Sequence, residues 1–333
     1  MKKFYLVLLI AVIALLTACA SDDAPKKEEV SKTESPEVTE TEKAEESADV
    51  YSLENDGVDQ TALDEALAQF PTDVPERVIT TSVPLTEMLH VLGVTPVGVP
   101  TSTNPIPADF DSIDRIGSPM APDLEVVTNL KPDLILGAES LRSTLEKNLE
   151  GFDLKAAYLK TDSFDDLKLS FKALGTYFNK KEEMNAVLSS LLNKENELIE
   201  QAKGKELPSV MLMIGTSDSF MVMSEKSYLG SLVKKLGADN IATSTLKVTD
   251  TYSPINMEDV VVADPDIILV LASGDHGASK DMFEKEVQSN DTWTKLSAYK
   301  NDNIHILDYN IFGVTSISNA EQALTEVANY FYK

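Results

Sequence analysis

The sequence predicts an α/β protein of two similar lobes, each with a central, mostly parallel sheet, bridged by one long helix and separated by a ligand cleft. The first observation is the run Asp266–Ala272, which is rich in Ile, Leu and Val and is preceded by an Asp-Pro pair. Such a run is typical of a strand buried on both faces of a parallel sheet. A glycine-flanked loop with His276 follows, and ligands of open α/β sheets gather at such carboxyl ends of strands.

The second observation is a unit that occurs twice in the chain. A Ser-Pro pair begins each copy, at Ser118 and at Ser253, and a glutamate follows at Glu125 and at Glu258. In both copies six residues then separate the glutamate from a Pro-Asp pair that leads into an apolar strand. Because the spacing agrees at both ends of the unit, we interpret the copies as equivalent parts of the two lobes, each with loops at the edge of the cleft.

The third observation is a long helical stretch between the two copies. The sequence from about Phe164 to Gly204 has few helix breakers, and one face carries Leu188, Leu191, Leu192 and Leu198. A single bridging helix makes a stiff connection, which favours small movements of the cleft walls over wide hinge closure.

The chain begins with the features of an exported lipoprotein. Met1–Lys3 and the apolar Phe4–Leu16 have the proportions of a secretory signal, and the apolar part is too short to span a membrane. Leu16–Cys19 then resembles a bacterial lipoprotein signal, in which the only cysteine of the chain, Cys19, becomes lipidated. We therefore expect a signal peptide over residues 1–18 and an extracytoplasmic protein that is lipid-anchored to the cell membrane.

A polar segment, residues 19–73, follows the predicted lipidation site. It is rich in Glu, Ser, Thr, Lys and Pro and has few large apolar residues before Leu63. Such a composition cannot bury enough apolar surface to offset the entropy of the chain, so we predict a disordered acidic tether. Thr61–Phe70 is its one candidate for a short helix.

The N-terminal lobe is predicted over residues 74–160. Pro84 at a first helical position and Gly93 as a stop define its first helix. The long polar loop Thr101–Ser118 has no period. The other expected elements are the strands Arg77–Ser82, Pro96–Pro100, Asp133–Gly137 and Leu154–Leu159, and the helices Leu124–Leu130 and Leu141–Leu149.

The interlobe helix is predicted over residues 161–204 and the C-terminal lobe over residues 205–333. Beyond the run described first, this lobe is expected to contain three further strands, the C-terminal helix and several shorter helices. They are the strands Ser209–Ile214, Phe220–Ser224 and Asn303–Leu307, the helices Tyr228–Leu236, Pro254–Val262 and Ser318–Tyr332, and short helices over Met282–Ser297.

Composition and motifs exclude several classes of function. The formal charge of −26 would repel nucleic acid. One cysteine excludes a disulfide framework, and three histidines disfavour a manganese or zinc site built from several converging ligands. The sequence contains no phosphate-binding glycine loop, nucleophile elbow or zinc-protease motif. These observations favour binding without catalysis, so we predict that the protein is not an enzyme.

The lipoprotein signal, Arg77–Ser102, the repeated Pro-Asp units and the central helix together resemble the binding lipoproteins of bacterial ABC importers. The match is to the class with a rigid helix between the lobes, which serves siderophores, cobalamin and haem, and it covers about Pro75 to the C-terminus. Within that class, Gly117–Asp123 and the His276 loop are similar to haem receptors of the IsdE type. The resemblance implies haem b as the transported ligand, an ABC permease and its ATPase as partners, and a monomer.

The resemblance also implies how haem is held. In that family a methionine and a histidine bind the iron from opposite faces, and the matching residues here are Met120 and His276. Haem iron accepts a thioether and an imidazole, and the pair leaves no open position, which suits a carrier. Without the resemblance, Met120 would be interpreted as a packing residue and His276 as a solvated loop residue.

The haem carboxylates need hydrogen-bond donors, and two segments are candidates. Thr81, Ser82 and Val83 lie at the expected start of a helix, which offers free N–H groups. Thr101 and Ser102 follow the second strand and are expected to face the cleft. Hydroxyl groups in such places also commonly cap helices.

Receptors of this class dock onto permease arginines through one carboxylate on each lobe. The first-lobe position matches Glu125, whereas the second falls near Lys234, which is not an acid, and leaves Glu258 or Glu225 as candidates. Two other functions stay open. One is a receptor of the same class for a ferric siderophore or a corrinoid, and the other is a lipoprotein enzyme or surface interaction protein that reuses the fold.

Overall fold

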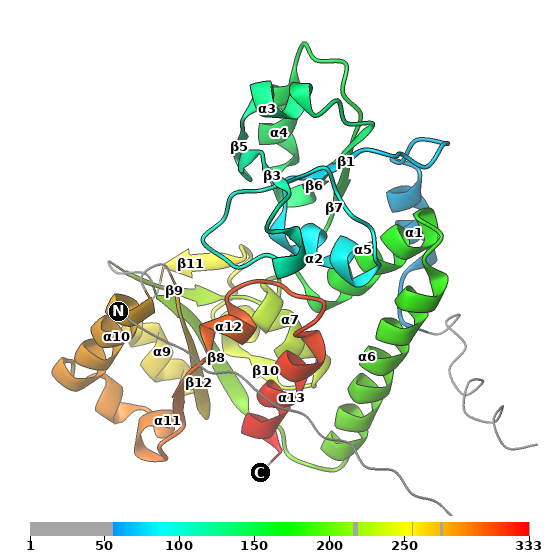
Figure 1. The fold of residues 1–333 in the computed structure, drawn as a ribbon. Coiled ribbons are helices and arrows are strands. Elements are labelled where there is room, and N and C mark those ends of the chain that lie inside the picture. The colour runs from blue at the N-terminus through cyan, green and yellow to red at the C-terminus, as the bar shows by residue number, and fades with distance from the viewer. Residues whose placement is uncertain (1–55, 216–218, 255, 274–275, 333) are drawn as a thin grey trace, which may run out of the picture. The chain divides into compact units, whose positions relative to one another are not determined.

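The computed structural model describes residues 56–215, 219–254, 256–273 and 276–332, without the side chain of His276. The predicted signal peptide, the lipidation site Cys19 and most of the predicted tether lie outside the described residues. Two separate sheets with surrounding helices organise the described part (Figure 1). This arrangement confirms the predicted mixed α/β class.

The first sheet has five strands in the order β3-β2-β1-β6-β7, and every neighbouring pair is parallel. A separate antiparallel hairpin, β4 with β5, follows β3. The strands are β1 (Val78–Thr80), β2 (Gly98–Val99), β3 (Asp114–Arg115), β4 (Gly117–Ser118), β5 (Ala121–Pro122), β6 (Leu134–Ala138) and β7 (Ala156–Leu159). The helices are α1 (Gln60–Leu67), α2 (Val83–Val91), α3 (Leu124–Asn129) and α4 (Arg142–Leu149).

The second sheet is mixed. Its strand order is β11-β9-β8-β12-β13, with β10 also paired to β8. The β11–β9 and β9–β8 pairs are antiparallel, and the other pairs are parallel. The strands are β8 (Ser209–Gly215), β9 (Phe220–Met223), β10 (Asp239–Asn240), β11 (Tyr252–Pro254), β12 (Ile267–Ala272) and β13 (Ile304–Ile306). The helices are α7 (Tyr228–Lys235), α8 (Ile241–Ser244), α9 (Met257–Ala263), α10 (His276–Ser289), α11 (Ser297–Lys300), α12 (Tyr309–Phe312) and α13 (Ala320–Phe331).

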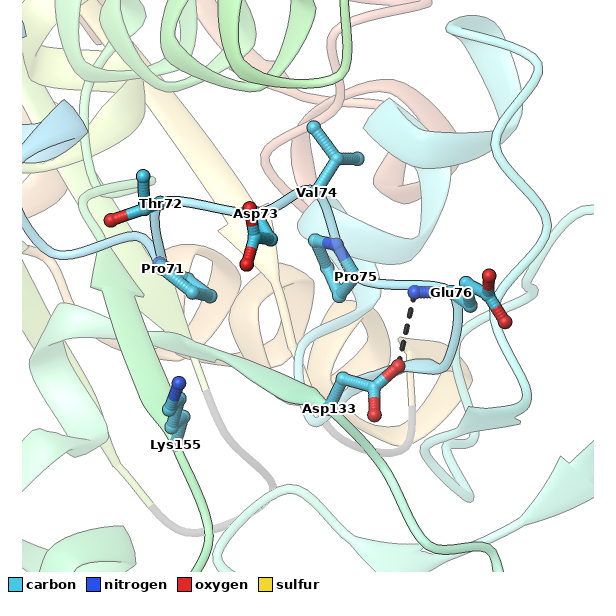
Figure 2. Close-up of a pocket in the computed structure, with 8 residues that line it drawn as sticks. All are labelled: Pro71, Thr72, Asp73, Val74, Pro75, Glu76, Asp133 and Lys155. Atoms are coloured by element: carbon cyan, nitrogen blue, oxygen red, sulfur yellow. Dashed lines mark hydrogen bonds between the residues drawn. The ribbon is translucent and has the colours of Figure 1, made fainter.

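The aspartate of the repeated Pro-Asp pair makes equivalent hydrogen bonds in both halves. The Asp133 carboxylate accepts from the backbone N–H group of Glu76, as Figure 2 shows, and from that of Arg77, directly before β1. The Asp266 carboxylate accepts from the N–H and the hydroxyl of Ser209, at the start of β8. Each aspartate therefore joins the starts of two neighbouring parallel strands, β6 to β1 and β12 to β8. The repeat found in the sequence is thus a repeat in structure.

Each sheet buries one face in a core of its own and the other in a shared core. In β6, Ile135 packs in a cluster confined to the first half, whereas its neighbours Leu134 and Leu136 belong to a larger cluster. That larger cluster also contains Leu269 of β12 and Leu232 of α7. A continuous apolar core therefore joins the two halves, in keeping with the expected stiff connection.

The helical stretch between the halves is two helices rather than one. Helix α5 (Phe164–Tyr177) ends before Asn179, whose φ of 56° is left-handed, and α6 (Lys181–Ala202) then begins (Figure 1). Asparagine is one of the few residues that adopts this conformation readily, so it ends a helix much as glycine does. Gly175 lies inside the last turn of α5 and Asn179 follows the helix, but neither was interpreted as a break, so the sequence predicted an unbroken helix.

The last part of the expected tether is folded. Helix α1 packs on α5 and buries Leu63 and Ala66, and Asp56 pairs with Lys172 of α5 at 2.7 Å. The Gln69 side chain accepts from the Tyr158 N–H and donates to the Tyr158 carbonyl, so it covers the free edge of β7. Residues 56–73, which the sequence assigned to the disordered tether, are therefore folded, because a few apolar residues suffice when they can pack on a neighbouring helix.

Candidate functional site

The N-terminus of α2 offers backbone donors without a capping side chain. Thr81 extends the pairing of β1, since its N–H donates to the Leu136 carbonyl at 2.9 Å. Ser82 is the N-cap residue, but its hydroxyl makes no capping hydrogen bond, and Val83 opens the helix. All three predicted residues are buried. The structure therefore places the positive end of a helix dipole here, which is a suitable partner for a carboxylate.

Thr101 and Ser102 lie directly after β2, beside the β4–β5 hairpin. The Thr101 N–H donates to the Gly117 carbonyl at 2.8 Å, which joins this loop to the hairpin. The Ser102 hydroxyl accepts from the Asn104 N–H at 3.0 Å and so stabilises a local turn. Thr101 is exposed and Ser102 half-buried, so only the first presents an open hydroxyl.

A cavity of about 330 Å³ lies between α2, the loop after β2 and residues 309–319. Val83, Glu87 and His90 line it from α2, and their spacing places them on one face of that helix. The Glu87 carboxylate accepts from the Ser316 hydroxyl at 2.7 Å and from the Ser318 N–H at 2.9 Å. Glu87 therefore joins the two halves at the wall of this cavity.

Met120 lies at the tip of the β4–β5 hairpin with its side chain directed into solvent. It is 60% exposed, which is unusual for so apolar a residue. Its N–H donates to the Ser118 hydroxyl, and its carbonyl accepts from the Asn148 side chain at 3.0 Å. Gly117, at φ 89°, has no room for a side chain, because a Cβ would lie 2.9 Å from the Asp123 nitrogen. The thioether is thus accessible on a restrained backbone, so Met120 does not act as a packing residue.

His276 is the first residue of α10 rather than the loop residue that the sequence suggested. The Ser273 N–H donates to the Gly215 carbonyl at 2.7 Å, and the buried Ser279 hydroxyl donates to the Ser273 carbonyl at 2.6 Å. The start of α10 is therefore joined to the carboxyl end of β12. The imidazole itself lies outside the described atoms, so its approach to Met120 stays a prediction.

The other two histidines have structural partners. His90 Nε2 lies 2.8 Å from the Asp109 carboxylate, and its ring packs edge-on against Phe110. His305 of β13 stacks on Tyr330 of α13 with ring centroids 4.7 Å apart. Neither arrangement collects further metal-binding groups. Within the described residues, no three His, Cys, Asp or Glu side chains converge on a site that could hold a metal ion.

Glu125 lies in the first turn of α3 and is exposed, where the Asp123 carboxylate caps the helix. Glu258 has the equivalent place in α9, exposed and preceded by the cap Asn256. Lys234 instead pairs with Glu225 at 3.1 Å. The two repeat-related glutamates thus lie on corresponding helices of the two halves.

A second cavity of about 330 Å³ lies beside the first strands of the N-terminal sheet. Pro71 to Glu76, Asp133 and Lys155 line it, as Figure 2 shows. Asp133 is already engaged by backbone N–H groups. None of the predicted site residues lies in this cavity, so it is separate from the candidate site.

Three side chains near the candidate site were not nominated from the sequence: Glu87, Asn104 and Asn148. A signal for Glu87 did exist, since it lies four residues after Val83 on the same helical face. No comparable signal existed for Asn148, because its contact with Met120 joins segments 28 residues apart. Across the part of the chain that the structure describes, no helix is both long and apolar enough to cross a membrane.

Comparison with known proteins supports a binding function. The model of the family described as periplasmic binding protein matches residues 78–310. The chain is 35% identical over 262 residues to the high-affinity heme uptake system protein IsdE of Staphylococcus aureus, covering 77% of this chain and 87% of that protein. The predicted resemblance to receptors of the IsdE type is therefore confirmed.

Solved structures of similar proteins support the same relationship. The crystal structure of S. aureus IsdE complexed with heme matches with a TM-score of 0.69 at 33% identity, covering 77% of this chain and 99% of that one. An ABC transporter substrate-binding protein from Listeria monocytogenes matches equally well, with a TM-score of 0.69 at 33% identity, over 78% of this chain and 99% of that one. These relatives are substrate-binding proteins rather than enzymes, as the sequence predicted. The chain belongs to the periplasmic binding protein family.

Proposed function

We propose that this chain is a lipid-anchored haem receptor that delivers haem to an ABC permease, with the iron held between Met120 and His276. The observation that carries the proposal is the exposed thioether of Met120 on a hairpin whose backbone is restrained on both sides. A sulfur in solvent gains nothing from packing, so its accessibility suits a ligand-binding role. The relatives' heme uptake function points to the same cargo.

The proposed ligand pair explains why the protein would bind haem without using it. A thioether and an imidazole occupy both axial positions of the iron, so neither oxygen nor substrate can bind there. The carboxylates of haem b would meet the N-terminus of α2 at Thr81 to Val83 and the hydroxyl of Thr101. A helix N-terminus without a side-chain cap supplies N–H donors and a favourable dipole for such groups.

The arginines argue against a strongly anionic siderophore as cargo. The chain has three arginines. Arg77 donates to the carbonyls of Leu130 and Lys131, Arg115 pairs with Asp111, and Arg142 is held by Glu139. Tris-catecholate ferric complexes are strongly anionic and are best bound by free cations, whereas haem needs only two carboxylate partners.

Titration of the purified protein with haemin tests the proposal. Trp293 is the only tryptophan, is 1% exposed, and lies 5.5 Å from the ring of Phe283 in α10. We expect haemin to quench its fluorescence at one equivalent and to produce a six-coordinate, low-spin absorption spectrum. A ferric siderophore or a corrinoid that displaces haemin at equal concentration would instead favour the alternative receptor of the same class.

The lipid anchor is proposed from Cys19 and has its own test. Replacing Cys19 with serine removes the thiol that receives the lipid, so the protein should move from the membrane fraction to the medium or the soluble fraction. Measured haemin binding of that variant should be unchanged. A Cys19→Ser protein that stays in the membrane fraction would show that something else anchors it.

Permease docking is proposed at Glu125, with Glu258 as its counterpart on the second half. Replacing both with alanine should lower haem uptake by cells several-fold while haemin binding in solution is unchanged, because both carboxylates are exposed and lie on capped helices. The pair Glu65→Ala on α1 and Glu182→Ala in the first turn of α6, both at exposed positions, is a charge-matched control. Equal uptake by the two double variants would contradict the docking role.

A further inference from the structure

The hairpin that carries Met120 has a turn whose conformation is unfavourable for pairing of its two strands. Ser118 pairs with Ala121, so Pro119 and Met120 form a two-residue turn. Two-residue hairpins prefer turns with a positive φ at the first central residue, because those match the twist of the strands. The proline ring excludes that conformation, and Met120 has no positive φ either. The strands therefore have a turn that tends to splay them.

The hairpin also has little pairing of its own. Each strand has two residues, and the Gly117–Pro122 pair lies at a non-hydrogen-bonded position, so the next cross-strand bond runs from the Asp123 N–H to the Ile116 carbonyl. Isolated two-stranded hairpins are at best marginally stable in water. The position of the tip must therefore depend on contacts from outside the hairpin.

Asn148 supplies such a contact to Met120 itself. Its side-chain amide donates to the Met120 carbonyl at 3.0 Å, while the Met120 N–H is held by Ser118. Both backbone polar groups of Met120 are therefore engaged, although its side chain is 60% exposed. The backbone is fixed and the thioether is left available.

The donor itself lies on a rigid support. Asn148 belongs to the last turn of α4, whose Leu145 and Leu149 are buried against the first sheet. Asn148 is half-buried and its hydrogen bond to Met120 is exposed, so the packed helix, rather than exclusion of water, holds the donor in place. A side chain on a packed helix thus restrains a loop that would otherwise be soft.

We propose that Asn148 is a positioning residue for Met120: its amide holds the hairpin tip so that the thioether stays at the place where it binds the haem iron. This inference rests on the proposed function, since it concerns the same sulfur. Without the amide, the tip samples more positions, and the fraction of time in which the sulfur can reach the iron falls. The iron then keeps its histidine but loses its second axial ligand part of the time.

Two variants remove the donor in different ways. Asn148→Asp keeps the shape but places a carboxylate against a carbonyl oxygen, and Asn148→Ala removes the group while favouring the helix. Lys147→Ala, an exposed neighbour on α4, is the control. In the protein without haem, we expect faster hydrogen–deuterium exchange in residues 116–123 of both Asn148 variants and no change in Lys147→Ala. With haemin, we expect a partial high-spin spectrum and about 5- to 10-fold faster haem loss, the effect of one hydrogen bond.

The outcomes separate this inference from the proposed function. Should both Asn148 variants keep the exchange rates and the spectrum of the unaltered protein while Met120→Ala changes the spectrum, the positioning role is wrong and the ligation stands. An unchanged spectrum in Met120→Ala would overturn the ligation and the inference together. Thermal unfolding of each protein shows which variants remain folded. If Asn148→Asp disrupts the hairpin, Asn148→Ala still tests the inference.

Discussion

Replacing His276 with alanine is expected to convert bound ferric haem from a six-coordinate, low-spin species to a high-spin species and to weaken binding by about 100-fold or more. Loss of a group that merely orients a metal ligand commonly costs 10- to 100-fold, so loss of the ligand itself should cost at least the upper end of that range. His276 lies at the start of α10, joined to the end of β12 through Ser279 and Ser273, so the substitution should not disturb the strand.

The Met120→Ala variant should show the same spectral change with a smaller loss of affinity, about 10-fold, because a thioether is the weaker ligand of the pair. Absorption spectra and haem transfer to an excess of apomyoglobin measure both effects. His305→Gln on β13 and Met257→Ala on α9, which line neither of the two cavities described above, are the matched controls. Six-coordinate, low-spin haem in both His276→Ala and Met120→Ala would show that other residues hold the iron.

The second large effect is expected at Glu195, which joins three helices in the interior. Its carboxylate lies 2.8 Å from Lys168 of α5 and 3.2 Å from Lys235 of α7, and the Lys168 side chain is only 3% exposed. Glu195→Ala leaves the Lys168 ammonium buried with Asp165 at 3.3 Å as its remaining partner. Breaking one side of a buried ion pair in this way costs about 3–5 kcal/mol of unfolding free energy.

Urea unfolding of the protein without haem measures that cost. The matched control is the double variant Glu195→Leu with Lys168→Met, which replaces the pair with apolar groups of similar size. Removal of both charges is often neutral or stabilising, so the double variant should recover most of the stability lost in Glu195→Ala. If the double variant is as unstable as the single one, packing at this position matters more than the uncompensated charge.

The same cluster predicts a pH dependence. Burial by itself would raise the pKa of Asp165, but hydrogen bonding and charge from Lys235, with the charge of Lys168, outweigh it and lower the pKa. A carboxyl whose pKa is lower in the folded state contributes stability above its unfolded pKa, and that contribution is lost as the pH falls through the folded pKa. The difference in unfolding free energy between neutral and strongly acidic pH should therefore be smaller in Asp165→Asn.

Several parts of the candidate site were accessible to sequence reasoning because their signals are local. The helix start at Ser82 and the strand before His276 are each recognisable from neighbouring residues, whereas Gly117 to Asp123 were identified through the family resemblance and their hairpin was not predicted. Others were not. Asn179 ends α5 through a left-handed conformation that a single asparagine signals only weakly, and the Gln69 side chain covers the edge of β7 through a contact between residues 89 positions apart.

The chain alone determined the class of fold, since buried strands and Pro-Asp turns are properties of adjacent residues. The proposed ligands Met120 and His276 came from the resemblance to a known family rather than from the residues alone. Only the tertiary structure decided that α1 joins the folded part, that Glu87 links the two halves, and that Asn148 restrains the tip on which Met120 lies. The physical reason is the same in each case. These interactions depend on surfaces assembled from distant segments, and the energy of such contacts is set by geometry that no local pattern encodes.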